Sequence, residues 1–450
     1  MKGAIKSASI SSLVNIEAFC LVLFGGCILS WVEPKLNVSE IEKRELTPFP
    51  TFSMEKLWAG DYTDSLDLYY SDHFMNRENW VEFTAWIKGN LGFRAHDLMV
   101  YQTENAELAG LDSILAADSL RNFKKDSTRN TIKKDPTSQP PEMKNLIMIY
   151  NGMAFQLFGR NNEAEINFAA TINSYKKKLG DSVRVFVCVV PGPIDFYLPD
   201  AYKSQANDEK PSIDFIYSKL DQKVLAVDAY TPLAANTDDF IYFKTDHHWT
   251  ARGAYLAYQA FCKKAGYEAV SLASFQRFIR KPFLGSLYNA TLDSRLKNSG
   301  DSLEYSIPPV ITQAWRYPDR NLQKIIPTEV VSKRLGQAGS YLTFIGGDYP
   351  LTHIITENKN GKKIFLIKDS YGNALVPFLT LHYKEIFVAD YRSFDSNIIS
   401  FILQHNIKDL LFLHNVAIAN TKYTASRESY LMRIKDAAPK VTRDTTQTVH

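Results

Sequence analysis

The sequence predicts an α/β protein whose central parallel β-sheet is covered by helices on both faces. The first observation is a set of short apolar runs, rich in β-branched and aromatic residues, that recur after residue 144. The second is the amphipathic pattern of the segments between several of these runs. Continuous apolar strands that alternate with helices are typical of a parallel sheet buried on both faces. At 450 residues the chain is long enough to bury a large core.

Five strands and four helices follow from these patterns. The predicted strands are 145–150, 183–190, 363–368, 385–390 and 409–415. The predicted helices are 163–179, 251–265, 373–382 and 396–405. Ligands of such sheets bind beyond the carboxyl ends of the strands, so polar residues that follow a strand are candidates for a site.

The N-terminal segment has the length and composition of a membrane-spanning helix. "LVNIEAFCLVLFGGCILSWV", residues 13–32, matches the roughly 20 apolar residues that cross a bilayer. Lys2 and Lys6 precede it, which places residues 1–12 in the cytoplasm by the positive-inside rule. A buried core helix is the alternative, although core helices are seldom apolar on all sides. We expect a single-pass anchor with the rest of the chain outside the membrane.

The remaining chain divides by composition. Helical spacing with aromatic residues on one face predicts a helical preface that packs on the main domain, and turn signals with short alternating runs predict a β-rich insertion over the strand ends. Polar, aperiodic stretches predict a mobile surface insertion and a disordered tail. The predicted parts are the preface 33–117, the polar insertion 118–144, the main domain 145–435 with its β-rich insertion 267–345, and the tail 436–450.

Charge and cysteine content narrow the functional class. A formal net charge of +3 gives no indication of nucleic-acid binding. Cys20 and Cys27 lie in the predicted anchor, and Cys188 and Cys262 lie in apolar surroundings, where we expect buried thiols. Whether Cys188 and Cys262 pair cannot be read from the sequence.

A candidate nucleophile follows the predicted strand 363–368. In "IFLIKDSYGN" the strand leads into Ser370, and a helical pattern follows. A serine there is placed at a strand's carboxyl end and a helix N-terminus, where the N–H groups of Ser370 and Gly372 can face a developing oxyanion. The alternative is a plain Ser/Asp helix cap.

A candidate base and acid lie together in "TDHHWT". In an extended chain, residues i and i+2 share a face, so Asp246 and His248 would point the same way and His247 the opposite way. This predicts a Ser370–His248–Asp246 triad supported by His247 and Trp249. A metal site is the alternative, but the other histidines show no ligand spacing, and we expect no metal.

These stretches together resemble the bacterial DHHW family, which is related to the alginate O-acetyltransferase type of SGNH-hydrolase-like proteins. The stretches, in chain order, are "KRELTPFP", "GDYTDSLDLYYSDHFMNR", "TDHHWT", "FLGSLY" and "KDSYGN". The resemblance implies an SGNH-hydrolase-like, flavodoxin-like sheet and a D-x-H motif with a distant serine, which correspond to Asp246, His248 and Ser370. It also implies a location outside the cytoplasmic membrane, a polysaccharide acceptor, and an acetyl donor supplied by a membrane-bound O-acyltransferase. We expect no cofactor.

Further site candidates lie at the strand ends. Asn415 and Asn373 compete as side-chain donors to the oxyanion, and Tyr371 is a candidate for stacking on a sugar ring. Arg392 follows another strand and is a candidate for binding substrate or fixing Asp369. Helix capping, a surface ion pair and a packed ring are the respective alternatives.

The predicted function is that of a serine O-acetyltransferase that modifies cell-surface or exported polysaccharide through an acetyl-serine intermediate. Two alternatives remain open: an acetylesterase that removes acetyl groups, and a non-catalytic glycan-binding or assembly protein with a vestigial triad.

Overall fold

The computed structural model describes residues 47–74, 98–102, 146–203, 208–337 and 339–434, and a few short stretches and single positions before residue 98. The predicted anchor 13–32 lies mostly outside these residues, and the predicted segments 1–12, 118–144 and 436–450 lie wholly outside them. Within the described part of the chain, no helix is both long and apolar enough to cross a membrane. The chain divides into two compact units, Met1–Phe93 and Arg94–His450.

The first unit contains the helical part of the predicted preface. Helices α2 (Met54–Ala59) and α3 (Asp61–Asp72) meet at Gly60, whose φ of 84° ends one helix and begins the next. The Ser53 hydroxyl caps α2 by accepting the N–H of Lys56 at 3.2 Å. The preface is not helical throughout, because Leu98–Gln102 forms strand β1 of the second unit.

The second unit is built on an eight-stranded sheet in the order β5-β4-β13-β11-β12-β10-β8-β9. The first five strands in this order are parallel, and antiparallel strands complete one edge. The parallel strands are β4 (Arg184–Val190), β5 (Val224–Ala226), β11 (Lys363–Lys368), β12 (Glu385–Asp390) and β13 (Asp409–Asn415). The others are β8 (Thr312–Tyr317), β9 (Ile326–Thr328) and β10 (Leu351–Thr356).

The order of the parallel strands is a rearranged doubly wound order. Numbered along the chain, the strands lie as 2-1-5-3-4, whereas a flavodoxin-like sheet has 2-1-3-4-5. If β11, β12, β13, β4 and β5 are instead numbered 1 to 5, the order read from β12 across to β5 is 2-1-3-4-5. The parallel strands therefore have the spatial order of a flavodoxin-like sheet, but the chain enters that order at a different strand. The reversal point, where such folds bind ligands, lies between β11 and β13.

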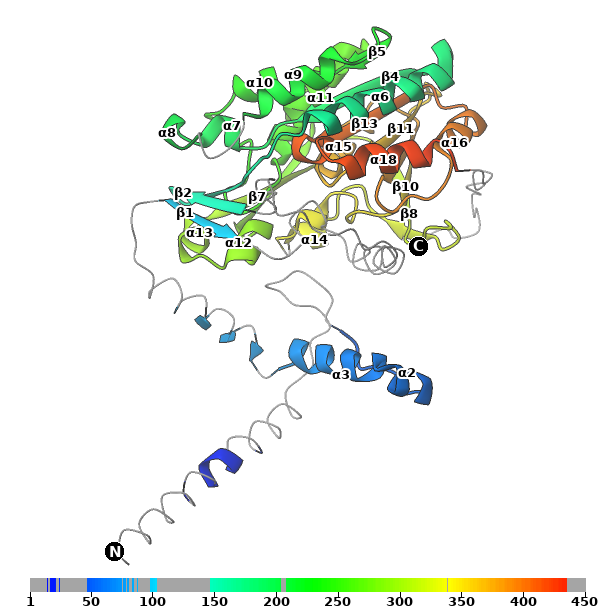
Figure 1. Ribbon diagram of the computed structural model, residues 1–450. Helices are drawn as coiled ribbons and strands as arrows, with labels where there is room; N and C mark the ends of the chain where they lie inside the picture. The colour runs from blue at the N-terminus through cyan, green and yellow to red at the C-terminus, as the bar shows by residue number, and fades with distance from the viewer. Residues whose placement is uncertain are drawn as a thin grey trace, which may run out of the picture. The chain divides into compact units, whose positions relative to one another are not determined.

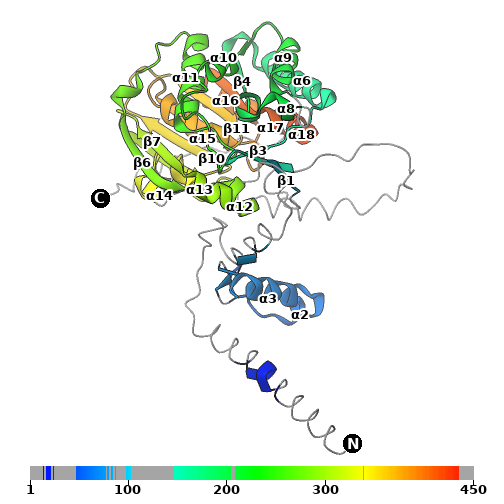
Figure 2. The same cartoon turned by 90° about the vertical axis from the view of Figure 1, so that its left-hand side faces the viewer.

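Two hydrophobic layers cover the sheet, because alternate residues of each buried strand face opposite sides. In β11, Ile364 and Leu366 pack on one side, and Phe365 and Ile367 pack on the other. The first side is covered by α11 (Ala251–Ala265) and α15 (Tyr371–Leu379). The second is covered by α6 (Asn162–Leu179), α9 (Glu209–Ser218), α16 (Ile398–Gln404) and α18 (Lys422–Leu431). Figures 1 and 2 show these helices on both faces of the sheet.

One predicted strand of the central sheet belongs to a smaller sheet. Strand β2 (Leu146–Tyr150) pairs antiparallel with β1 and with β3 (Met153–Gln156). Asn151 and Gly152 join β2 to β3 with φ of 47° and 70°. An Asn-Gly pair with two positive φ angles is the usual two-residue hairpin turn, so the sequence carried the signal against a central strand.

The predicted β-rich insertion is only partly separate from the main sheet. Strands β6 (Gln276–Phe283) and β7 (Asp301–Ile307) form a two-stranded sheet, but β8 and β9 extend the central sheet. The shorter helices of the unit are α7 (Ile194–Tyr197), α8 (Asp200–Lys203), α10 (Tyr230–Ala234), α12 (Ser286–Thr291), α13 (Ser294–Ser299), α14 (Lys333–Gln337) and α17 (Val416–Ala419). The 3₁₀ turns are η2 (Gly180–Ser182), η3 (Leu272–Ser274) and η4 (Tyr341–Thr343).

Cys188 and Cys262 are both buried and free, so the pairing that the sequence left open is absent. Burial raises the pKa of each thiol to about 12, which makes both unreactive near neutral pH.

Candidate active site

The candidate nucleophile, Ser370, lies directly beyond β11 at the start of α15. Its backbone is helical (φ −60°, ψ −22°), and its side chain makes no capping bond to α15. The capping is done by Asp369, whose Oδ1 accepts the N–H of Tyr371 at 2.9 Å. The Ser370 hydroxyl is therefore not used as a helix cap, and its Oγ lies 2.7 Å from His248 Nε2.

His248 and Asp246 meet in a tight turn. Tyr242 and Trp249 form an isolated β-bridge across it. Asp246 Oδ1 accepts the N–H of His248 at 2.9 Å and lies 2.6 Å from His248 Nδ1. The predicted pairing of Asp246 with His248 is present, but the extended-chain reasoning was wrong. The rings of His247 and His248 lie 3.8 Å apart, centroid to centroid, and do not point to opposite sides.

The acid of this set is held in its charged form. Burial alone would raise the pKa of Asp246, but His248, His247 and the N–H of Ser286 lower it below its ordinary value. The Ser286 N–H donates to Asp246 Oδ2 at 2.8 Å. Both carboxylate oxygens are thus fixed, one on the imidazole and one on the start of α12.

Gly285 leaves the space that Asp246 occupies. A Cβ at this position would lie 2.2 Å from Asp246 Cβ and 2.4 Å from Asp246 Oδ2. Its φ of −100° suits any residue, so the requirement for glycine is steric and not conformational. In the sequence, "FLGSLY" contributes to the family resemblance, but no local pattern in it indicates that Gly285 and Ser286 contact the acid.

We expect Gly285→Ala to reduce ester turnover by about 100-fold, because displacing a catalytic group by roughly 1 Å costs on that order. The measurement is kcat/KM with a chromogenic acetyl ester, alongside thermal melting. Gly159→Ala is the matched control, since nothing lies within 4 Å of its added methyl group. Full activity in the Gly285 variant would contradict the role assigned to this contact.

The predicted supporting residues join the two halves of the site. Trp249 is fully buried, and its Nε1 donates to the backbone carbonyl of Tyr371 at 3.0 Å. The Tyr371 hydroxyl donates in return to the backbone carbonyl of His247. The ring of His247 lies with Nδ1 2.7 Å from Ser286 Oγ. These contacts hold the histidine turn against the start of α15.

Asp369 anchors the segment below the serine. Its Oδ2 accepts the N–H of Asn415 at 2.7 Å, which links the ends of β11 and β13. His414 lies 3.7 Å from that oxygen and 2.7 Å from Glu428. Burial would lower the pKa of His414, but Glu428 and Asp369 raise it to about 9.

Most of the predicted oxyanion donors are engaged elsewhere. The Gly372 N–H donates to Asp369 O at 3.0 Å, and Gly372 itself allows close packing on Lys368, whose Cβ would be 2.6 Å from an added methyl group. The Asn373 amide donates to Asp348 at 2.9 Å. The Asn415 amide donates to Val190 O at 3.3 Å and accepts the Ala417 N–H at 2.9 Å. The Ser370 N–H, at the start of α15, is the remaining predicted donor.

Arg392 does not contact Asp369, contrary to one prediction. It donates to Asp390 at 2.6 Å and to Asp348 at 2.9 Å in a buried network that also contains Lys368. Burial would raise the pKa of Asp348, but Lys368 and Arg392 lower it below its ordinary range. Through Asn373 this network fixes the first turn of the helix that follows Ser370.

We expect Asp348→Asn to destabilise the protein by about 3–5 kcal/mol, because it leaves two buried cations with one buried anion. Urea denaturation measures this loss, and Asp181→Asn, in an exposed ion pair with Lys223, is the control expected to show no measurable change. The folded pKa of Asp348 is depressed, so its contribution is present above about pH 4 and is lost as the pH falls below that value. Unchanged stability would contradict this description of the network.

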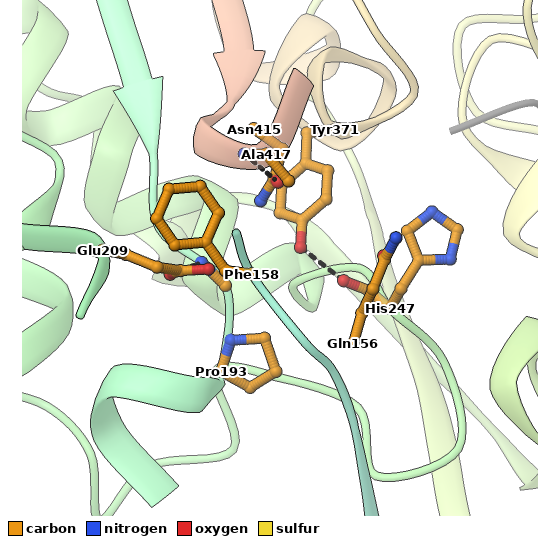
Figure 3. A pocket seen from close by; sticks show the side chains of 9 residues that line it. Gln156, Phe158, Pro193, Glu209, His247, Tyr371, Asn415 and Ala417 are labelled. Atoms are coloured by element: carbon orange, nitrogen blue, oxygen red, sulfur yellow. Dashed lines mark hydrogen bonds between the residues drawn. The ribbon is translucent and has the colours of Figure 1, made fainter. Parts of the chain in front are cut away.

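A pocket lies next to the triad, beyond the ends of β4 and β13. Tyr371 and Asn415 lie above it, His247 on one side and Glu209 on the other (Figure 3). Burial and the nearby Asp195 raise the pKa of Glu209 well above its usual value, against the Gly192 N–H, which lowers it. The lining residues are Gln156, Phe158, Gly192, Pro193, Glu209, His247, Tyr371, Asn415 and Ala417.

Asp246, His247 and His248 also have ligand atoms within 4.8 Å of one another, close enough to share a metal ion. Protein groups already hold these atoms. His248 Nδ1 is on Asp246, His248 Nε2 is on Ser370, and His247 Nδ1 is on Ser286. Metal binding would require these contacts to break, so the geometry favours proton transfer over metal ligation.

The fold and site define an α/β protein with an acid, an imidazole and a serine in a hydrogen-bonded series. The family model described as DHHW protein matches residues 112–389, and the chain belongs to the DHHW family. A DHHW family protein from Eubacterium siraeum is 35% identical with a TM-score of 0.58, over 63% of this chain and 94% of that chain.

Two structures of Bacillus cereus PatB1 share the fold at lower identity. One is 21% identical with a TM-score of 0.54, over 62% of this chain and 99% of that chain. The other, with a sulfonyl adduct, is 20% identical with a TM-score of 0.51, over 60% and 94%. A comparison with curated proteins found no match.

Proposed function

We propose that this protein is a serine O-acetyltransferase that transfers acetyl groups to polysaccharide hydroxyls through acetyl-Ser370. The observation that carries the proposal is the unbroken series Asp246–His248–Ser370, with contacts of 2.6 and 2.7 Å. Its position at the reversal point of the sheet supports it, since ligands of doubly wound folds bind there. The motifs resemble those of alginate O-acetyltransferases, and for this reason we propose acetyl as the transferred group and a polysaccharide as the acceptor. From the same resemblance and the rearranged strand order, we also propose that the fold is SGNH-hydrolase-like and circularly permuted.

In the first step His248 Nε2 removes the proton of Ser370 Oγ, and Oγ attacks the acetyl carbonyl of the donor. Asp246 stabilises the imidazolium that forms, and the Ser370 N–H is placed to donate to the oxyanion. When the tetrahedral intermediate collapses, the donor's ester C–O bond breaks. The proton on His248 passes to the departing alkoxide, which leaves acetyl-Ser370.

In the second step a hydroxyl of the acceptor gives its proton to His248 and attacks acetyl-Ser370. The new ester forms as the Oγ–C bond breaks, and Oγ recovers the proton. Water in place of the acceptor would give hydrolysis with the same residues.

We also propose where the protein is located and which partners it has. A membrane anchor at residues 13–32 would hold the catalytic domain outside the cytoplasmic membrane, near an acyltransferase that supplies acetyl groups across it. The hydroxyl-bearing acceptor is then an exported or cell-surface polysaccharide.

The test is a partition experiment with the domain beginning at residue 33. A chromogenic acetyl ester is turned over with and without oligosaccharides, and acetate and acetylated sugar are quantified. The proposal expects acetylated sugar to accumulate at the expense of acetate. Acetate alone with every acceptor would support the acetylesterase alternative, and no turnover of any ester would support a glycan-binding protein without catalysis.

A further inference from the structure

We infer that Tyr341 stabilises the protonated form of His248 through the face of its ring, as a positioning residue for the base. The inference rests on the proposed function. The two rings are stacked, with centroids 3.9 Å apart and planes 8° apart. Tyr341 lies outside "TDHHWT", "KDSYGN" and the other stretches that resemble the DHHW family.

The geometry of the stack favours a cation over a neutral imidazole. Two neutral aromatic rings prefer an offset or edge-on arrangement to close parallel stacking, because their negative faces repel. An imidazolium held over a ring face is instead attracted by that face. His248 carries its charge only while it holds the proton of Ser370. The contact is therefore stronger in the transition state than in the resting enzyme, which is the condition for accelerating a reaction.

The contacts of His248 with Asp246, Ser370, His247 and Tyr371 differ from this stack. Asp246 and Ser370 contact the two ring nitrogens, Nδ1 and Nε2, and not the face of the ring. The His247 ring lies 3.8 Å away at a tilt of 35°, and a second charge there would oppose protonation of His248. The Tyr371 ring is more distant, at 5.4 Å and a tilt of 51°.

The fold holds Tyr341 in place by packing on its edges. Phe344 lies 5.2 Å from the Tyr341 ring at 67°, and Phe243 lies 6.3 Å away at 85°. Ser340 caps the turn that carries Tyr341 by accepting the N–H of Leu342 at 3.2 Å.

The chain just after Tyr341 is in an unusual conformation. Ile345, Gly346 and Gly347 have φ of 52°, 79° and 113°. A β-branched residue at positive φ is rare, because its side chain crowds the backbone there. Such strain is retained where the surrounding structure requires the geometry. Here the strained turn connects Tyr341, whose ring stacks on His248, to Asp348. Asp348 belongs to the buried network that fixes the first turn of α15, the helix that follows Ser370.

The test compares Tyr341→Phe with Tyr341→Leu in the protein that carries out ester turnover. The phenylalanine variant keeps the ring face, so we expect kcat within about twofold of the parent. The leucine variant loses the ring face, so we expect kcat to fall by about 3- to 30-fold with little change in KM. The acidic limb of its pH–rate profile should also move to lower pH, because His248 then binds a proton less tightly. Equal losses in both variants, or no loss in either, would overturn the inference.

A second series keeps the inference testable if the leucine variant does not fold. The series starts from the Tyr341→Phe variant, and its phenyl ring is replaced by rings with one, two and three fluorines. Each fluorine weakens the negative ring face while nearly preserving its shape. We expect log kcat to fall steadily with fluorine number, and a flat series would overturn the inference. If the Tyr341 inference fails but Ser370→Ala is inactive, the proposed function still holds. The failure of the inference can therefore be told apart from the failure of the proposed function.

Discussion

Ser370→Ala is expected to lower kcat for ester turnover by a factor of about 10⁴ to 10⁶, the loss seen when a serine nucleophile is removed from a hydrogen-bonded triad. The hydroxyl is in contact with His248 Nε2 at 2.7 Å, which is the geometry that activates a nucleophile. Because Ser370 is 3% exposed and does not cap α15, its removal deletes one buried hydrogen bond and little packing. The folded state should therefore survive the substitution.

The measurement is turnover of a chromogenic acetyl ester, with circular dichroism and melting to confirm folding. Ser306→Ala is the matched control, since Ser306 is 4% exposed in β7 and lies outside the triad. A Ser370 variant that is folded and fully active would remove the nucleophile from this account.

Asp246→Asn should lower kcat by about 10⁴-fold with a smaller effect on KM, as for triads in which the acid orients the imidazole. An amide cannot stabilise the imidazolium, and its NH₂ group can select the wrong tautomer of His248. The shape of the side chain is kept, so the amide oxygen of the variant can still accept the N–H of Ser286, which now reaches Asp246 at 2.8 Å.

Kinetics at several pH values distinguish this role from a structural one. The folded pKa of Asp246 is depressed, so its stabilising charge is present above about pH 4 and is lost only as the pH falls further. If the proposed activity is present, the parent protein should therefore show no loss of ester turnover between about pH 5 and 8 that titrates with Asp246. A folded Asp246→Asn variant within about tenfold of the parent would contradict the assignment.

The sequence was informative where a pattern maps directly onto local geometry. Apolar runs located β4, β11, β12 and β13, since a strand buried on both faces needs such a run. Strand β5 was missed because three residues give no periodicity. Strand β2 was misplaced because its composition suits a central strand, while the Asn-Gly turn after it specifies a hairpin.

The site shows the same division. "KDSYGN" and "TDHHWT" identified the three residues that the fold brings together, because the type of residue at a strand end is visible in sequence. The contacts of Asn373 and Arg392 with Asp348, and of the Asn415 amide with Val190, were not predictable, since each joins residues that are distant in sequence. The bond from Arg392 to Asp390 and the contact of Asn415 with Ala417 are local. Tyr341 was missed for the same reason: only the folded chain places its ring on His248.

The central claim, an acetyl group carried on Ser370, is tested most directly by mass spectrometry of the trapped intermediate. The protein is exposed briefly to an acetyl ester, quenched in acid and digested. We predict an acetyl group on the peptide that contains Ser370, assigned to that residue by fragmentation and absent after Ser370→Ala. Acetylation at another residue, or steady turnover with unmodified Ser370 at every time of quenching, would contradict the mechanism.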